Sequence, residues 1–129
     1  MDRESTAPLV TALDHVQLAM PEGQEASAER FYCDVLGFTR ISKPADLEAR
    51  GGCWFESNGV RVHLGVEPDF VAARKAHPAF VVSDLQRMRR RLEDAKFSVV
   101  EDTQLAGFER FYSSDPFGNR IEFLQPVKS

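Results

Sequence analysis

The chain has 129 residues, of which 43% are hydrophobic and 28% charged, a composition typical of a single folded domain with its own core. A net charge of −4 lacks the basic excess that nucleic-acid binding requires, and no apolar run is long enough to cross a membrane. Two cysteines are too few for a disulfide framework and indicate a reducing compartment. We therefore expect a cytoplasmic protein with neither a nucleic-acid nor a membrane partner.

The beginning of the chain is polar and lacks the apolar region of a signal peptide, so we expect an N-terminal tail over residues 1–10 and one domain over residues 11–127. The first half of that domain predicts a strand, a helix, a second strand and a hairpin. These elements cover residues 13–20, 26–36, 38–41, 53–56 and 60–66. Gly37 suits the left-handed backbone that ends many helices, and Asn58-Gly59 between apolar runs is a strong signal for a tight hairpin turn.

The second half predicts the same order of elements. Residues 67–76 form a linker, in which residues 70–74 allow a short helical turn. The elements that follow cover residues 77–82, 84–94, 97–100, 108–113 and 120–125. Ser83 is placed to cap the helix, and the turn at residues 115–118 separates the last two strands.

The sequence predicts that the two halves repeat one β-α-β-β-β unit, with module one over residues 11–67 and module two over residues 74–126. In each unit a histidine lies at the start of the first strand, His15 or His77. In each unit a turn glycine lies four residues before a polar residue of the last strand, His63 or Glu122. The pattern predicts an α+β fold in which two tandem modules form curled mixed sheets around a cavity.

Three imidazoles and one carboxylate suit a divalent cation such as Zn, Ni, Co, Mn or Fe. Each residue has a structural alternative, since a single histidine on an apolar strand is usually hydrogen-bonded in the core, and Glu122 alone could point to water. All three histidines of the chain, however, occupy equivalent places in the repeat. We therefore predict that His15, His63, His77 and Glu122 bind a divalent metal ion, whose identity the sequence leaves open.

Four short segments carry a resemblance to a known family. They are Leu-Asp-His-Val at 13–16, Phe-Tyr-Cys-Asp-Val-Leu-Gly-Phe at 31–38, Asp-Pro-Phe-Gly-Asn at 115–119 and Arg-Ile-Glu-Phe at 120–123. By these segments the chain resembles the vicinal oxygen chelate superfamily, which includes glyoxalase I, fosfomycin-resistance proteins, bleomycin-binding proteins, methylmalonyl-CoA epimerase and extradiol dioxygenases. The likeness spans about residues 11–126, and it implies a fold more firmly than a reaction, because the superfamily hosts many chemistries.

The resemblance implies a homodimeric, metal-dependent enzyme of lyase or isomerase type, in which the cation chelates two adjacent oxygens of a small-molecule substrate. Glu122, the one carboxylate among the four ligands, is the expected catalytic base, with Glu56 as second choice. His63 departs from the family pattern, because glyoxalase-like members carry a carboxylate or an amide there. It could also turn away from the metal or act as a base.

Two alternatives stay open. The set His15, His77 and Glu122 alone would suit an Fe(II) ring-cleaving dioxygenase. A metal-free resistance protein that sequesters a drug or a metabolite is the other.

Side chains near the four ligands are the expected substrate contacts. They are Gln17, Trp54, Phe55, Phe108 and Phe111. Most aromatic residues on strands belong to the core, so only part of this set should reach a substrate. Arg61 and Arg110 alternate with the aromatic residues and could pair with an anionic substrate.

Overall fold

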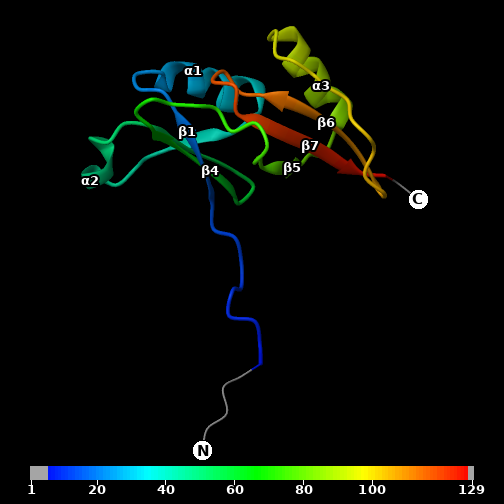
Figure 1. Ribbon diagram of the computed structural model, residues 1–129, viewed down its shortest axis with the longest axis horizontal. Helices are drawn as coiled ribbons and strands as arrows, with labels where there is room; N and C mark the ends of the chain where they lie inside the picture. Colours follow the sequence, from blue (N-terminus) through cyan, green and yellow to red (C-terminus); the bar gives the residue numbers. More distant parts are fainter. Residues whose placement is uncertain (1–5, 128–129) are drawn as a thin grey trace, which may run out of the picture.

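A computed structural model describes residues 6–127, which form two small sheets with helices α1 and α3 above them in the view of Figure 1. The first half contains β1 (Val16–Met20), α1 (Glu25–Glu29), the π-helix η1 (Arg30–Val35), β2 (Thr39–Ile41), α2 (Ala45–Glu48), β3 (Cys53–Ser57) and β4 (Val60–Val66). The second half contains β5 (Ala79–Val81), α3 (Leu85–Asp94), β6 (Phe108–Ser114) and β7 (Arg120–Pro126). Within residues 6–127, the helices are too short or too polar to span a bilayer.

The two sheets repeat one topology. The first has the strand order β1-β4-β3-β2 and the second the order β5-β7-β6, and in both the first strand of the half runs parallel to its last strand. The register also repeats, since Gln17 lies opposite His63 and Ala79 lies opposite Glu122, each two residues after the histidine of its half. The predicted α+β architecture of two tandem modules is therefore confirmed.

The second sheet lacks the strand predicted over residues 97–100. Only Val100 pairs with β6, through two backbone hydrogen bonds of 2.8 Å with Tyr112. Beyond Val100 the ladder does not continue to residue 102, because the backbone N–H of Arg110 opposite that position donates to the side chain of Gln104 at 3.0 Å. The fourth strand of the repeat is thus reduced to a single bridge.

Three further local predictions differ from the structure. The helix predicted over residues 26–36 is a short α-helix that continues as the wider η1, where Leu36 N–H donates to the carbonyl of Phe31 at 3.0 Å. Residues 44–52, for which the sequence predicted no helix or strand, contain α2. Residues 70–74 have no helical turn.

One face of each sheet packs into a shared core. Val62 and Leu64 on β4 and Ile121 and Phe123 on β7 are at most 1% exposed. Because successive side chains of a strand point to opposite faces, the residues between these pairs lie on the other face. Those residues are His63 and Glu122.

The two halves are joined by hydrogen bonds between distant parts of the chain. Tyr32 on η1 donates its hydroxyl to the buried carboxylate of Asp115 at 2.8 Å. The side-chain amide of Asn119 donates to the carbonyl of Ala19 on β1 at 2.8 Å, and its oxygen accepts from the N–H of Ala73 at 3.3 Å. Asp115 and Asn119 therefore fix how the second sheet sits against the first.

Candidate functional site

The first pair of predicted ligands lies at the start of β1 and on β4. His63 is 7% exposed and lies between two rings: the His15 ring stacks at a centroid distance of 4.1 Å and the Trp54 ring at 3.9 Å. Trp54 is placed there by the antiparallel register of β3 and β4, in which it lies opposite His63. The Nδ1 atom of His15 lies 2.9 Å from a carboxylate oxygen of Asp14. This pair is held by stacking more than by hydrogen bonds.

The second pair is joined directly. Nε2 of His77 lies 2.9 Å from Oε1 of Glu122, and Nδ1 of His77 lies 2.9 Å from the carbonyl oxygen of Lys75. Arg110 on β6 donates to Oε2 of Glu122 at 3.2 Å. Glu122 is 6% exposed, so its charge is compensated inside the protein by an arginine and a histidine.

The contact between His77 and Glu122 bears on whether a metal ion fits. Both ring nitrogens of His77 face oxygen atoms that can only accept, a carbonyl on one side and a carboxylate on the other. Nε2 must therefore carry a proton, or a cation in its place, for its contact with Oε1 to be attractive. The donor chemistry of this pair, one imidazole and one carboxylate oriented by neighbours, is that of a divalent metal site.

The electrostatics of two of the residues favour the forms that bind cations. Burial raises the pKa of Glu122, but the hydrogen bonds from His77 and Arg110 outweigh it, and the pKa lies below its ordinary value. Burial lowers the pKa of His63, and the neighbouring His15 lowers it further. An ionised Glu122 and a neutral His63 are the protonation states that ligate a metal.

One chain does not bring the four predicted ligands together. Among residues 6–127, no three His, Cys, Asp or Glu side chains converge in a way that could hold a metal ion. His15 and His63 belong to the first sheet, whereas His77 and Glu122 belong to the second. Each sheet thus offers two donors on the face away from the core, which is half of a four-ligand set.

The predicted substrate contacts lie on opposite faces of their strands, some on the outer face and some in the core. Trp54 is half-buried and lies against His63, and Gln17 is exposed on the same sheet face. Phe108 is half-buried at the start of β6. Phe55 and Phe111 have no exposed surface and pack into the core, so the structure does not support them as substrate contacts. The reason is the alternation of strands, which turns Phe55 away from Trp54 and Phe111 away from Arg110 and Tyr112.

Two residues near Glu122 make contacts that the sequence did not predict. Arg110 binds the carboxylate of Glu122, although its charge suggested an anionic substrate as partner. The ring of Tyr112 lies opposite Glu122 in register, edge-on to the His77 ring at 5.3 Å. Their alternation on one strand was visible in the sequence, but the pairing of β6 with β7 in this register was not.

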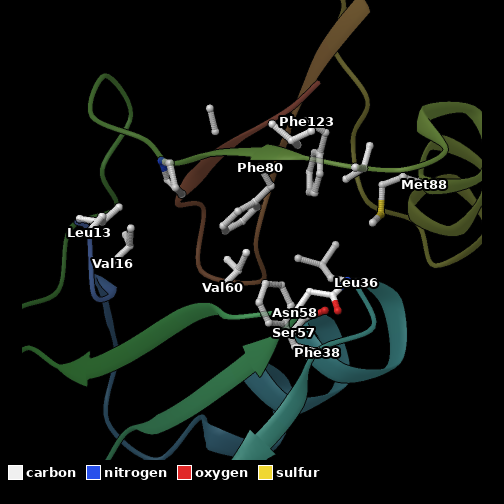
Figure 2. A pocket seen from close by; sticks show the side chains of 14 residues that line it. Leu13, Val16, Leu36, Phe38, Ser57, Asn58, Val60, Phe80, Met88 and Phe123 are labelled. Carbon is white, nitrogen blue, oxygen red and sulfur yellow. The ribbon is translucent and has the colours of Figure 1, made fainter. Parts of the chain in front are cut away.

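An apolar pocket between the two halves contains none of the residues of the two polar pairs. A pocket of about 500 Å³ separates the two halves, and Figure 2 shows Phe80, Met88 and Phe123 on one side of it and Leu36, Phe38, Ser57 and Asn58 on the other. None of the four predicted ligands lines it. A second pocket, of about 390 Å³, is lined by Gln17 from the first sheet and His77 from the second. The chemistry of the donors therefore points to the second pocket, despite the greater volume of the first.

Residues 12–123 match the family model described as the Glyoxalase/Bleomycin resistance protein/Dioxygenase superfamily. A search of curated proteins returns no match. Among solved structures, a protein from Bacillus anthracis assigned to the glyoxalase family is 41% identical, with a TM-score of 0.90 over 95% of this chain and 100% of the other.

Two more distant structures share the fold. The fosfomycin resistance protein FosX from Listeria monocytogenes is 12% identical, with a TM-score of 0.72 over 92% of this chain and 96% of the other. TnmS3, an antibiotic binding protein from Streptomyces sp. CB03234, is 20% identical, with a TM-score of 0.69 over 92% of this chain and 100% of the other. At these identities the likeness shows the architecture alone.

Proposed function

Because the chain belongs to the Glyoxalase/Bleomycin resistance protein/Dioxygenase superfamily, we propose that it is a metal-dependent enzyme acting on a small molecule that offers two adjacent oxygens to a divalent cation. The observation that carries the proposal is the contact of 2.9 Å between His77 Nε2 and Glu122 Oε1. His77 and Glu122 need a shared proton or cation between them. In the repeat they occupy the positions that His15 and His63 occupy in the first half.

Four ligands require more than one chain. Each copy supplies two donors on each of two sheets, and within residues 6–127 these donors do not converge. A two-fold homodimer would satisfy this, with His15 and His63 of one copy completing the set begun by His77 and Glu122 of the second copy. Two equivalent sites would result, one for each copy.

The bound cation would supply Lewis-acid stabilisation of negative charge developing on the chelated oxygens. Around that position, Arg110 holds Oε2 of Glu122 and thereby orients the carboxylate. Glu122 is the candidate general base, since Oε1 faces the ligand position and its lowered pKa keeps it ionised. The Trp54 and His15 rings exclude water from both faces of His63.

Metal content tests the proposal. Protein purified without a nickel column is expected to bind Zn, Ni, Co, Mn or Fe at about one ion per chain, as measured by elemental analysis after loading and desalting. Glu122→Ala and His15→Ala should each lose at least about tenfold in metal affinity, because each removes a ligand. Glu109→Ala is the matched control, since Glu109 is exposed on the neighbouring strand. A wild-type chain that retains none of these ions would end the proposal.

The two-chain arrangement has a separate test. Light scattering should show a dimer, and mixtures of His15→Ala with Glu122→Ala chains should recover tight metal binding in part of the population, because one of the two sites in a mixed dimer is intact. If both donor pairs of a site came from one chain, mixing would restore nothing.

A metal-free binding protein is the second candidate. It is favoured by the pairing of Glu122 with both Arg110 and His77, which balances the carboxylate without a metal. The apolar pocket of about 500 Å³ would then hold the ligand. This alternative predicts that small-molecule affinity, measured by calorimetry, is unchanged in excess chelator, whereas the metal-dependent enzyme would lose it.

A further inference from the structure

Arg120 lies on β7 two residues before Glu122, so both side chains lie on the face away from the core. Its guanidinium carbon lies 3.9 Å from the centroid of the Tyr112 ring, a cation–π contact that holds the group over the ring. Within residues 6–127 the Arg120 side chain has no hydrogen-bond or ion-pair partner. Its donors are therefore positioned but unused.

Two other arginines differ in this respect. Arg110 pairs with Glu122, and Arg61 pairs with Asp14 and Glu56. These two were the arginines that the sequence suggested for an anionic substrate, and the structure gives both of them carboxylate partners. Arg120 is the half-buried cation on this sheet face that keeps its donors available.

A second cation shares the space in front of Arg120. A pocket of about 270 Å³ is lined by Arg120 and Arg74, with Ser98 and Ser114 beside them, and by the ring of Tyr112. None of the described residues that line it is acidic. The Arg74 side chain is exposed and, within the described part of the chain, has no carboxylate partner. Two uncompensated guanidinium groups with hydroxyl donors beside them form a site for an anion.

Tyr112 connects this pocket to the candidate ligands. One face of its ring carries Arg120, while the His77 ring meets it edge-on at 5.3 Å. Its hydroxyl accepts a hydrogen bond from Arg110 at 3.2 Å, and in the strand register it lies opposite Glu122. A small molecule held at Glu122 and His77 would therefore have the Arg120 pocket directly beside it.

We propose that Arg120, fixed on the Tyr112 ring and assisted by Arg74, binds the anionic group of the substrate, a carboxylate or a phosphoryl group. This rests on the proposed function for the identity of the molecule as a substrate, but the anion site itself needs no metal. The substrate class is thereby narrowed to anionic small molecules that carry their chelating oxygens a short distance from the charged group.

Binding of two simple anions tests the site. Metal-free, full-length protein is titrated at constant ionic strength with inorganic phosphate in one arm and acetate in the other, and the backbone amide signals of Gly118 and Arg120 are followed by NMR. We expect a saturable shift of both signals, and the tighter anion identifies the group. Arg120→Gln should weaken binding about tenfold or more, because it removes the charged donor that the anion would bind.

Arg90→Gln is the matched control, since Arg90 is exposed on α3 away from this pocket, and it should bind the anions like the wild type. Absence of a saturable shift with either anion, or equal affinity in Arg120→Gln and wild type, would overturn the proposal. Its failure is separable from that of the metal site: Arg120→Gln should keep its metal, and Glu122→Gln should lose metal but still bind the anion. If the wild-type chain binds the anions but retains no metal ion, the anion-site proposal stands and the proposed metal-dependent function is wrong.

Discussion

The two cysteines lie in different environments. Cys53 on β3 has no exposed surface, and burial raises the pKa of its thiol to about 11. Cys33 on η1 is half-buried, and burial together with the charge of Glu29 raises the pKa of its thiol above the ordinary value. Neither thiol is activated, so neither is a candidate nucleophile.

Thiol labelling should separate the two cysteines. At pH 8 a thiol with a pKa of about 11 is ionised in only about one molecule in a thousand, and Cys53 is also inaccessible. We expect Ellman's reagent to modify Cys33 first and to reach Cys53 only after denaturant is added. Because the folded-state pKa is raised, stability from Cys53 is present below pH 9 and falls as the pH rises towards 11. Cys53→Ala should flatten that fall, and rapid labelling of both thiols in the native protein would contradict this account.

At the residue scale, the repeat supplied the signal for the four candidate ligands His15, His63, His77 and Glu122. The strand register places His63 and Glu122 at matching positions of the two sheets, and metal binding by the four residues stays a prediction. Arg110, which pairs with Glu122, was assigned a different partner, because alternation along one strand does not reveal which residue lies across the sheet. For the same reason Phe55 and Phe111 were predicted to contact the substrate, although both are fully buried in the core.

At the scale of elements, α3 shows how closely a helix start can be read from sequence. The predicted cap was Ser83, but the helix begins one residue later and Asp84 is its N-cap. The Asp84 carboxylate accepts a hydrogen bond from the N–H of Arg87 at 3.0 Å. Ser and Asp are both good caps, so their adjacency left the choice to the tertiary structure.

Asp84→Ala should lower the free energy of unfolding by about 1 kcal/mol, because it leaves the Arg87 N–H without its acceptor and removes a negative charge from the start of the helix. The change can be measured by urea denaturation. Ser83→Ala is the matched control and should change stability by less than about 0.5 kcal/mol. Equal effects at the two positions would show that the capping assignment is wrong.

The hairpin of the first half was predictable because its signal is local. Asn58 and Gly59 have φ values of 50° and 79°, the left-handed backbone that this pair of residues tolerates best. The reduction of residues 97–100 to a single bridge between Val100 and Tyr112 was not predictable, since Phe97, Val99 and Val100 have the β-propensity of a strand and only the tertiary structure decides whether they pair.

At the scale of the molecule, Asn119 forms the main polar joint between the halves. It is 1% exposed and bonds Ala19 on the first sheet, Ala73 in the linker and Asp115 in its own turn. In the sequence Asn119 belonged to a segment that carries the family resemblance, with no sign of a contact to the first half. Its partner Ala19 lies 100 residues away, a separation at which sequence patterns carry no information about contact.

Asn119→Ala should therefore cost roughly 2–4 kcal/mol of unfolding free energy, since it leaves buried backbone and carboxylate groups without partners. Denaturant melts followed by circular dichroism would measure it. Gln24→Ala is a suitable control, because this amide lies at a helix start without a side-chain capping bond. If both variants melted alike, the hydrogen bonds of Asn119 would not be a main source of stability between the halves.

The ends of the two main helices differ in one residue. Gly37 ends η1 with a φ of 90°, and Lys96 follows α3 with a φ of 69°. A lysine in this conformation is less favourable than glycine by about 1 kcal/mol. The second half thus has the same left-handed bend without the residue best suited to it, and Lys96→Gly should raise the melting temperature without touching either proposed ligand site.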